Sequence, residues 1–395
     1  MIKKVLSYVR ILFCWIVISP LNILIPRKKG LIVVIGKLSG EIVDNTKYLF
    51  IHGLRKKKNI RFLTKDKSVL KTHSKLKKHI VLFGGIKGVL TLLRASYIVV
   101  DYSHWSYRNP LYFFLSLKAR KVHLWHGLTF KPVELGLINN GIPYIKSRFF
   151  RHVVNYDLMV STSVFWTDNL YKKYFLTKNV ENYGYPRNDV LFRKPDHLDL
   201  IGVDLKKYEF LQNAKKEGHK IAIYSPTFRD DGNDAFSSGH LNLLKLNNFL
   251  NNYRITLVLK MHPLNAHTYE DMSNIINYDK DFDVYPVMSL SDIMITDYSS
   301  IYIDYLIIDR PIVFFNYDYE QYLKKNRKLQ SEFLDTIPGV ITRDQVSLEK
   351  AILDHLIVGN DSHKNQRSNL KEISYEFFDG DSAHRIFCKF DKWRK

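Results

Sequence analysis

Short apolar runs that alternate with amphipathic stretches are the feature that most restricts the fold of this chain. Helix-type periodicity fills most of the intervals between the runs. One interval, Asp44 to Gly53, predicts a helix capped by Asp44 and closed by Gly53. Alternation of this kind predicts a doubly wound α/β fold. The expected buried parallel strands are residues 30–36, 95–101, 120–125, 158–161, 220–224, 256–260, 293–296 and 311–315.

A polar connection around residues 188–216 divides the expected strands into two sets. The chain has 395 residues, of which 46% are hydrophobic, and this is ample for two globular domains. We therefore predict two Rossmann-like domains facing a cleft. The expected segments are an apolar and basic stretch at 1–29, an N-terminal acceptor-side domain at 30–190, a C-terminal donor-binding domain at 191–345, and helices at 346–395 that pack back on the domains.

The charge of the chain is unevenly distributed. The formal net charge is +21, yet the first 150 residues hold 28 Lys and Arg against 5 Asp and Glu, and the remainder holds 32 against 34. An excess confined to one part of a chain indicates a polyanionic neighbour such as a phospholipid surface, an anionic polymer or nucleic acid. The two cysteines, Cys14 and Cys388, form no disulfide framework, which favours a reducing compartment.

Residues 11–25 are almost wholly apolar and have basic residues on both sides. Fifteen residues are too few to cross a bilayer comfortably, where about 20 are needed, and Pro20 and Asn22 interrupt the run. No small-residue cleavage site precedes the basic residues 27–29, as a signal peptide would require. We expect a membrane-associating segment on the cytoplasmic face, with a first buried helix of the domain as the alternative.

Polar clusters follow the expected strands at their carboxyl ends, where open α/β sheets bind ligands. The fullest cluster is the turn at 297–300, in which Asp297 is placed to accept from a sugar hydroxyl and Ser299 and Ser300 offer donors at a helix N-terminus to phosphate. The alternative is that these three residues only cap the helix. The other clusters lie at 126–131, 184–189, 225–230 and 260–263.

These clusters, taken in order, resemble the CDP-glycerol glycerophosphotransferase family of teichoic acid and capsule synthesis. The resemblance covers roughly residues 30–345 and rests on Trp125-His126-Gly127 with Lys131, on 184–189, 225–229 and 260–263, and on 291–305. Family members usually read His-Gly-Thr-Pro-Leu-Lys where this chain has His126-Gly-Leu-Thr-Phe-Lys131. The resemblance implies a GT-B fold, a peripheral membrane enzyme and transfer of an alditol phosphate from a CDP donor, CDP-glycerol or CDP-ribitol, to a hydroxyl of a lipid-linked or polymeric acceptor.

The residue types suit that chemistry. Phosphoryl transfer needs a base near the attacking hydroxyl and cationic or N–H donor groups around the diphosphate. We expect His126 to be the base, because its pKa range fits the task, and His262 to assist at the diphosphate or leaving phosphate. The expected donor-binding residues are Gly127, Lys131, Arg187, Ser225, Thr227, Arg229, Lys260, Asp297, Ser299, Ser300 and Asp304.

No Cys/His cluster or carboxylate pair in the sequence has metal-ligand spacing. We therefore expect no cofactor, with the CDP-alditol as donor substrate. One rival interpretation is a GT-B nucleotide-sugar glycosyltransferase, which could use the same helix terminus for its diphosphate. A more distant rival is a nucleic-acid-binding protein; the apolar run between basic clusters favours lipid over nucleic acid, and no nucleic-acid-binding motif is present.

Overall fold

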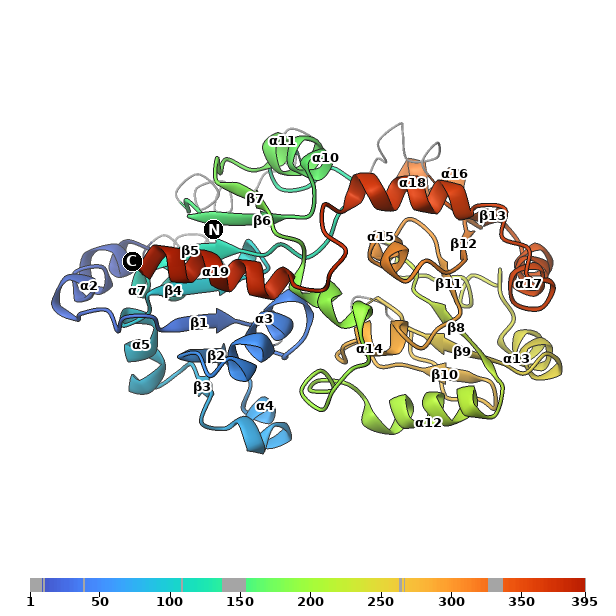
Figure 1. Ribbon diagram of the computed structural model, residues 1–395, viewed down its shortest axis with the longest axis horizontal. Helices are drawn as coiled ribbons and strands as arrows, with labels where there is room; N and C mark the ends of the chain where they lie inside the picture. Colours follow the sequence, from blue (N-terminus) through green and yellow to red (C-terminus); the bar gives the residue numbers. More distant parts are fainter. Residues whose placement is uncertain are drawn as a thin grey trace. The chain divides into compact units, whose positions relative to one another are not determined.

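The computed structural model describes Val9 and residues 11–37, 40–107, 109–136, 154–262, 265, 267–325 and 337–394. The chain forms two compact units (Figure 1). Unit 1 comprises Met1–His126, Val133–Asp189 and Asp379–Lys395, and unit 2 comprises Gly127–Pro132 and Val190–Phe378. Each unit is built on its own parallel sheet, which shows the α/β fold with two parallel sheets.

The sheet of unit 1 has the strand order β3-β2-β1-β4-β5-β6-β7, and all its pairs are parallel. Its central strand β1 contains only Ile and Val and is buried along its length, as expected for a strand covered on both faces. The strands are β1 (Ile32–Ile35), β2 (Ile60–Thr64), β3 (Ile80–Leu82), β4 (Tyr97–Val100), β5 (Arg120–His123), β6 (Leu158–Ser161) and β7 (Val180–Asn182).

Helices of unit 1 come from both ends of the chain. The helix α19 (Ser382–Arg394) contacts α3 (Asp44–Arg55), and the Tyr97 hydroxyl donates to the backbone oxygen of Phe390, 3.1 Å away (Figure 1). The remaining helices are α2 (Leu21–Leu24), α4 (Lys67–Thr72), α5 (Ile86–Leu93), α6 (His104–Tyr107), α7 (Pro110–Leu115), α10 (Val164–Trp166) and α11 (Lys172–Tyr174), with π-helical turns at Cys14–Ile18 and Thr167–Tyr171.

The sheet of unit 2 repeats this topology, with the order β10-β9-β8-β11-β12-β13. Its strands are β8 (Lys220–Tyr224), β9 (Ile255–Leu259), β10 (Ile275–Asn277), β11 (Ile293–Thr296), β12 (Ile312–Phe315) and β13 (Val340–Thr342). Its helices are α12 (Leu205–Lys216), α13 (Leu243–Asn252), α14 (Tyr285–Met288), α15 (Ile301–Tyr305), α16 (Tyr319–Lys325), α17 (Gln345–Leu353) and α18 (Lys364–Ser374), with shorter turns at Leu306–Ile308 and Asp354–Val358. A further turn, Pro186–Phe192, contains the boundary between the two units.

The expected end of the first long helix was wrong. Helix α3 continues to Arg55, and Gly53 lies inside it, where an added Cβ would approach Ile60 to 2.8 Å and Phe387 to 3.0 Å. Gly53 therefore permits close packing and does not terminate the helix. The expected cap was also wrong, because the side chain of Asp44 is held by two cations described below.

The N-terminal apolar segment is divided between two environments. Cys14 and Asn22 are buried in unit 1, where the Asn22 side chain donates to the backbone oxygen of Phe114 at 2.7 Å. Trp15 and Ile23, by contrast, are 65% and 78% exposed. Within the described part of the chain, no helix combines the length and hydropathy required of a transmembrane span. The segment therefore presents an apolar face while its other face packs on the core.

Candidate active site

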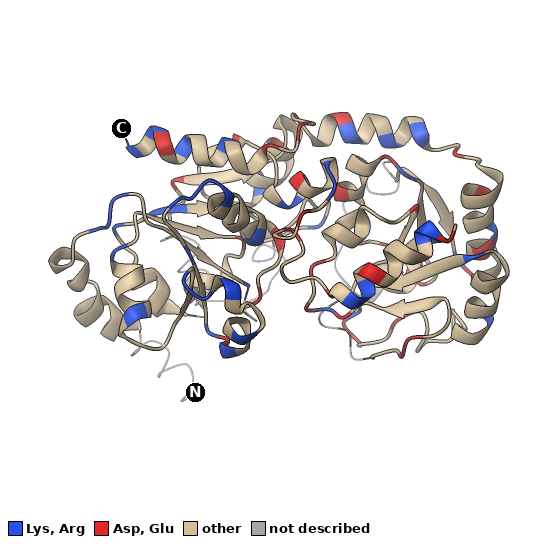
Figure 2. Ribbon diagram, turned by 60° about the horizontal axis from the view of Figure 1, so that its bottom comes forward, with Lys and Arg blue, Asp and Glu red and all other residues tan. Residues whose placement is uncertain are grey.

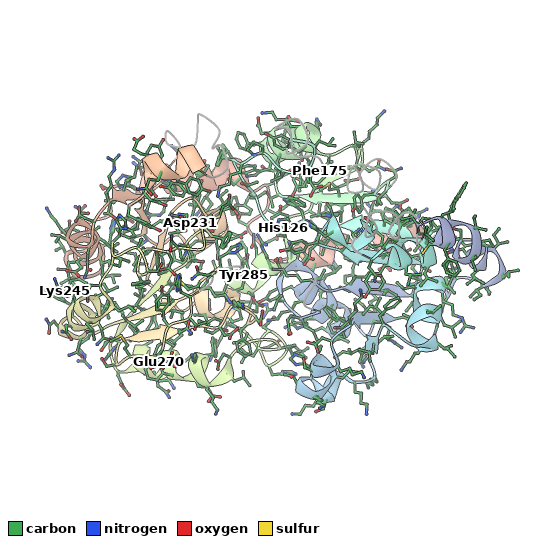
Figure 3. The ribbon with its side chains drawn as sticks, turned by 180° about the vertical axis from the view of Figure 1, so that it is seen from behind. His126, Phe175, Asp231, Lys245, Glu270 and Tyr285 are labelled. Carbon is green, nitrogen blue, oxygen red and sulfur yellow. The ribbon has the colours of Figure 1, made fainter. Side chains whose placement is uncertain are left out.

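His126 follows β5 on a sharply turned backbone. Trp125, directly before it, has a positive φ of 59°, a conformation that non-glycine residues adopt only when their surroundings impose it. The backbone N–H of Trp125 donates to His123 Nδ1 at 3.0 Å, and its carbonyl accepts from Asn45 Nδ2 at 2.8 Å. The indole also packs against Phe175, with ring centroids 4.8 Å apart. Figure 3 labels His126 and Phe175. These contacts fix the backbone from which the His126 side chain projects.

The ring of His126 is oriented by two neighbours. It stacks on Tyr102, and its Nδ1 lies 3.3 Å from the backbone oxygen of Asp101. Because a carbonyl oxygen only accepts hydrogen bonds, the proton belongs on Nδ1 and the lone pair on Nε2. Burial lowers the pKa of His126 to about 3, so the neutral imidazole is present at physiological pH. This pKa lies well below the range for which His126 was expected to be the base, so burial weakens its basicity, whereas the geometry leaves Nε2 as the nitrogen that accepts a proton.

A buried ion network surrounds the backbone of His126. Arg187 donates through Nη1 to Asp44 at 2.7 Å and to the backbone oxygen of His126 at 2.6 Å. The other carboxylate oxygen of Asp44 lies 2.7 Å from Lys37 Nζ. Burial alone would raise the pKa of Asp44, but the adjacent charges of Lys37 and Arg187 lower it well below its usual range. Arg187, expected to bind the donor, is here bonded to protein groups that position the His126 loop.

Asp101 lies beside this network and is itself buried. Its Oδ2 accepts from the Thr46 hydroxyl at 3.0 Å. Burial, followed by the nearby negative charge of Asp44, raises the pKa of Asp101 to about 7. Asp44 is thus held ionised, and Asp101 is close to half protonated at neutral pH. Carboxylates with perturbed pKa values are common in functional sites.

In unit 2, Arg229 is the centre of a second buried network. It makes a two-pronged contact with Asp318, at 2.6 Å from Nε and 3.0 Å from Nη2, and its Nη1 lies 2.8 Å from Asp297. The guanidinium also lies 5.2 Å from the ring of Tyr298 and 5.0 Å from that of Tyr322. Arg229 was expected to contact phosphate directly, but in this structure its charge is met by two carboxylates.

Asp297 joins two of the predicted loops. Besides Arg229, it accepts from the backbone N–H of Thr227 at 2.8 Å and of Ser299 at 3.2 Å. It is fully buried, so its geometry supports a loop-holding role in place of the expected contact with a sugar hydroxyl. Ser300 occupies the N-cap position of α15 without a side-chain capping bond, and both serines are half-buried. The alternative in which the serine hydroxyls only cap the helix is therefore not supported.

The remaining predicted residues of unit 2 fall into two groups. Lys131 joins the Arg229 network, because its Nζ donates to the Tyr322 hydroxyl at 2.8 Å. Lys260 and Asp304 are bonded elsewhere: Lys260 donates to the backbone oxygens of residues 279 and 282, and Asp304 accepts from the hydroxyls of Tyr285 and Tyr375. These two contacts hold turns and helices together and differ from the expected donor contacts.

Three more predicted residues belong to unit 2. Two of them follow strands, and the third is the first residue of the unit. His262 follows β9, is exposed, and has its ring centroid 5.8 Å from that of Phe228 in the loop after β8. Ser225 directly follows β8, and its backbone oxygen accepts from the Thr296 hydroxyl at 2.8 Å. Gly127 is buried and begins the short stretch 127–132 that belongs to unit 2. His262 is therefore the accessible titratable group among the predicted residues of this unit.

Sequence reasoning missed the supporting residues of both networks. Asp101 is the last residue of one expected strand and Asp318 comes shortly after another, so the position rule that found Asp297 also applies to them. Tyr102 and Lys37 carried no such signal, because their roles depend on contacts between distant segments. Across the described ranges, no three His, Cys, Asp or Glu side chains gather as a potential metal site.

The fold and the clusters at the strand ends place this chain in the class of two-unit α/β proteins with Rossmann-type sheets. A family model for CDP-glycerol:poly(glycerophosphate) glycerophosphotransferases matches residues 18–389. The chain belongs to this family.

Relatives bear the names of teichoic acid polymerases and primases, and a solved structure shares the fold. A teichoic acid poly(glycerol phosphate) polymerase from Staphylococcus epidermidis is 29% identical over 63% of this chain and 36% of its own length. A teichoic acid ribitol-phosphate primase from Bacillus spizizenii is 27% identical over 71% of this chain and 72% of its own length. The solved structure of the wall teichoic acid polymerase TagF has a TM-score of 0.73 at 21% identity and covers all of this chain and 98% of that one. The matched region spans about a third of the length of two of the polymerases that this chain matches.

Proposed function

We propose that this chain transfers an alditol phosphate, glycerol phosphate or ribitol phosphate, from a CDP-activated donor to a hydroxyl of a lipid-linked or glycan acceptor in teichoic acid or capsular polymer synthesis. The observation that carries the proposal is the neutral His126 imidazole, whose Nδ1 lies against a carbonyl while Nε2 keeps its lone pair. Family membership and the polymerases and primases among the relatives support the substrate class.

The reaction uses His126 as general base. Nε2 takes the proton of the acceptor hydroxyl as its oxygen attacks the phosphorus next to the alditol. The bond from that phosphorus to the bridging oxygen breaks, and CMP leaves with the electron pair. Charge grows on the leaving phosphate, where the accessible His262 and the hydroxyls of Ser299 and Ser300 are the donors we assign. Arg229 and Asp297 hold the loops that carry these groups.

The proposal assigns the base to His126 and the donor-binding groups to His262, Ser299 and Ser300 of unit 2. A crystal structure with bound CDP-glycerol tests the second assignment. The diphosphate should lie against His262, Ser299 and Ser300, and a donor bound away from these residues would contradict it.

Donor selectivity tests the function itself. The purified protein should release CMP from CDP-glycerol or CDP-ribitol when a teichoic acid linkage lipid or its glycerol-phosphate-extended form is supplied, and mass spectrometry should find the acceptor heavier by one or more alditol phosphates. A panel of UDP-sugars provides the comparison. Transfer from a UDP-sugar with no transfer from either CDP-alditol would replace this proposal with the glycosyltransferase alternative.

We also propose that the chain binds the cytoplasmic face of the membrane, where CDP-alditols are made. The exposed apolar face of residues 12–24 and the basic residues 27–29 support this location. A groove of about 370 Å³ is lined by four cationic side chains, those of Lys28, Arg61, Lys87 and Arg94. Among the charged positions coloured in Figure 2, blue Lys and Arg prevail on unit 1, whereas blue and red both occur along unit 2. Anionic lipid head groups suit such a surface.

A further inference from the structure

The groove lined by Lys28, Arg61, Lys87 and Arg94 lies along the amino edge of the unit 1 sheet. Among its lining residues, Lys28 comes shortly before β1, Asn59 directly before β2, and Arg94 shortly before β4. The backbone N–H of Lys28 donates to the backbone oxygen of Arg94 at 2.8 Å, so these two residues are neighbours. Because the strands are parallel, all their amino ends lie at this one edge.

The positive charge of this groove is not neutralised by any carboxylate that the structure describes. No Asp or Glu is among its described lining residues, and none of its four cations forms an ion pair with a described carboxylate. The Arg61 guanidinium donates to the backbone oxygen of Ile60 at 2.8 Å, a contact that leaves its charge uncompensated. At the other edge of the same sheet, by contrast, Lys37 Nζ lies 2.7 Å from Asp44. Cations without a counter-charge favour an anionic ligand.

The exposed apolar face of residues 12–24 is attached to the same edge. Arg27, which follows this face in the chain, donates through Nη1 to the backbone oxygen of Lys118 at 2.8 Å, shortly before β5 begins. Ile23 and Leu24 are 78% and 75% exposed. An apolar face beside a basic groove matches an anionic phospholipid bilayer, in which phosphate groups lie directly above acyl chains. Nucleic acid and free phosphate have no acyl chains for the apolar face to contact.

His126 lies at the opposite edge of the sheet from Lys118. The strand β5 begins shortly after Lys118, contains four residues, and ends three residues before His126. At about 3.3 Å per residue, the strand alone spans about 13 Å. A bilayer placed against the amino edge therefore leaves His126 more than about 13 Å from the lipid phosphates.

We propose that the amino edge of the unit 1 sheet faces the bilayer, that the groove holds an anionic phospholipid head group, and that His126 acts on acceptor hydroxyls carried away from the bilayer on a spacer. The last part rests on the proposed function, in which His126 is the base. It restricts the acceptor: a hydroxyl of the phospholipid head group itself is out of reach, whereas one at the end of a chain longer than about 13 Å is within reach.

Fluorescence quenching on vesicles tests the orientation without any turnover. Thr91→Cys places a label in the last turn of α5, inside the groove, and Lys67→Cys places one at the start of α4, after the carboxyl end of β2. Both are made with Cys388→Ser, because Cys388 is exposed whereas Cys14 is buried. On phosphatidylglycerol vesicles that contain doxyl-labelled lipid, the label at 91 should be quenched and the label at 67 should not. Quenching of the label at 67, or of neither label, overturns the orientation.

Sedimentation with phosphatidylglycerol vesicles tests the groove. Each basic residue near an anionic surface contributes roughly fivefold in affinity, so Lys87→Ser combined with Arg94→Ser should weaken binding roughly 25-fold. The matched control is Lys67→Ser combined with Lys71→Ser, two exposed lysines of α4 that do not line the groove, and it should bind like the parent. If the two double variants bind alike, the groove is not the head-group site.

Free sn-glycerol 3-phosphate distinguishes a lipid from a soluble phosphate as the occupant of the groove. An excess of it, at constant ionic strength, should leave the parent protein on the vesicles, because it offers no acyl chains to the apolar face. Release of the protein would show that the groove takes free phosphate instead of a phospholipid.

Two anchored acceptors test the restriction on the substrate, with CDP-glycerol as donor. One is phosphatidylglycerol in vesicles, and the other is a lipid in the same vesicles that carries glycerol phosphate on a spacer longer than β5. The spacer lipid should be elongated and phosphatidylglycerol should not. Equal rates for the two, zero included, would contradict the restriction. A protein that also leaves the teichoic acid linkage lipid unchanged contradicts the proposed function, and the quenching and vesicle binding then still decide the orientation and the groove.

Discussion

The imidazole of His126 lies parallel to the phenol ring of Tyr102, with ring centroids 4.5 Å apart and 3° between the planes. This stack, together with the 3.3 Å approach of Nδ1 to the Asp101 carbonyl, leaves the imidazole little freedom to rotate. A general base that is held in one orientation reacts more often from a productive geometry. Tyr102 is therefore a positioning residue for His126.

Two substitutions of Tyr102 distinguish the role of its ring from the role of its hydroxyl. Tyr102→Phe keeps the stacked ring and should retain kcat within a few-fold, whereas Tyr102→Ala should lower kcat by roughly tenfold or more, because His126 loses its orientation. The KM for CDP-glycerol should change little in either variant, as Tyr102 belongs to unit 1 and the assigned donor groups to unit 2. Equal kcat values for the two variants would rule out the stack as an orienting contact.

His126→Ala should abolish most turnover while donor binding persists. Removal of a general base typically costs about 10²- to 10⁴-fold in rate. Single-turnover release of CMP measures the chemical step, and calorimetry with CDP-glycerol measures donor affinity. His267→Ala, at an exposed histidine of unit 2, should behave as the parent. Near-normal turnover of a folded His126→Ala protein would show that another group acts as the base.

Arg229→Met should destabilise unit 2. The substitution leaves Asp297 buried without its cation and removes both contacts to Asp318. Breaking a buried ion pair by removing one partner typically costs about 3–5 kcal/mol. Thermal or urea unfolding followed by circular dichroism measures the change. Arg343→Met, at an exposed arginine of the same unit, is the control and should shift stability by less than about 0.5 kcal/mol.

Asp101→Asn should change how stability depends on pH. The pKa of Asp101 is raised from 3.8 to about 7 in the folded protein, so between these values the folded state holds a proton that the unfolded state has released. This group's contribution to stability therefore falls as pH rises from about 4 to about 7. The asparagine side chain of the variant cannot ionise. The free energy of unfolding of the variant should therefore rise relative to that of the parent across this window and remain higher above it.

Urea unfolding at intervals from pH 4 to pH 8.5 tests this expectation. Comparison with the parent at each pH cancels the contributions of other titrating groups, which can have the opposite sign. His52 is one such group, because burial lowers its pKa to about 4. Asp168→Asn, at an exposed carboxylate of unit 1, serves as the matched control. A constant difference between Asp101→Asn and the parent over the whole range would show that Asp101 ionises normally in the folded protein.

Membrane binding should depend on the exposed face of the N-terminal segment. Deletion of residues 1–29 is a poor test, because it also removes Cys14 and Asn22 from the core of unit 1. Substitution of Trp15 and Ile23 by serine changes only exposed side chains. The parent should stay on anionic vesicles in high salt, whereas the double variant should be released, since its remaining attraction is electrostatic and is screened within about 8 Å at physiological salt.

Vesicle sedimentation across a salt series measures this difference. Val346→Ser removes an equally exposed apolar side chain from unit 2 and should sediment like the parent. If the double variant stays on the vesicles at every salt concentration, residues 12–24 are not the membrane-binding face.

The sequence predicted the central strands of both sheets well. Residues 158–161, 220–224 and 293–296 form strands with the expected bounds, because uninterrupted apolar runs are typical of strands buried on both faces. The strands β2, β3, β7, β10 and β13 were not predicted. The strands β3, β7, β10 and β13 lie at the edges of the two sheets and have three residues each, and β2 carries Arg61 within its run. The apolar pattern of all five strands is therefore weak.

The sequence singled out candidate positions for the site but not the partners of their side chains. The rule that ligands bind at strand ends leads to His126, Asp297 and His262. It does not reveal that Arg229 and Asp297 bond to each other, or that Arg187 reaches the carbonyl of His126, because these contacts join segments about 60 to 70 residues apart. Such pairings depend on side-chain packing, which a pattern of residue types does not encode.

The placement of α19 has a consequence for synthesis on the ribosome. Unit 1 contains residues from both before and after Val190–Phe378, and α19 supplies Phe390 to the ring of Tyr97, 4.7 Å away. At about 5–20 residues per second, translation of Val190–Phe378 takes roughly 10 to 40 seconds, and this time separates the synthesis of the two parts of unit 1. During that time the face that will receive α19 is uncovered, while unit 2 has all of its residues and can fold. A nascent chain stalled before residue 382 should therefore recruit chaperones through unit 1.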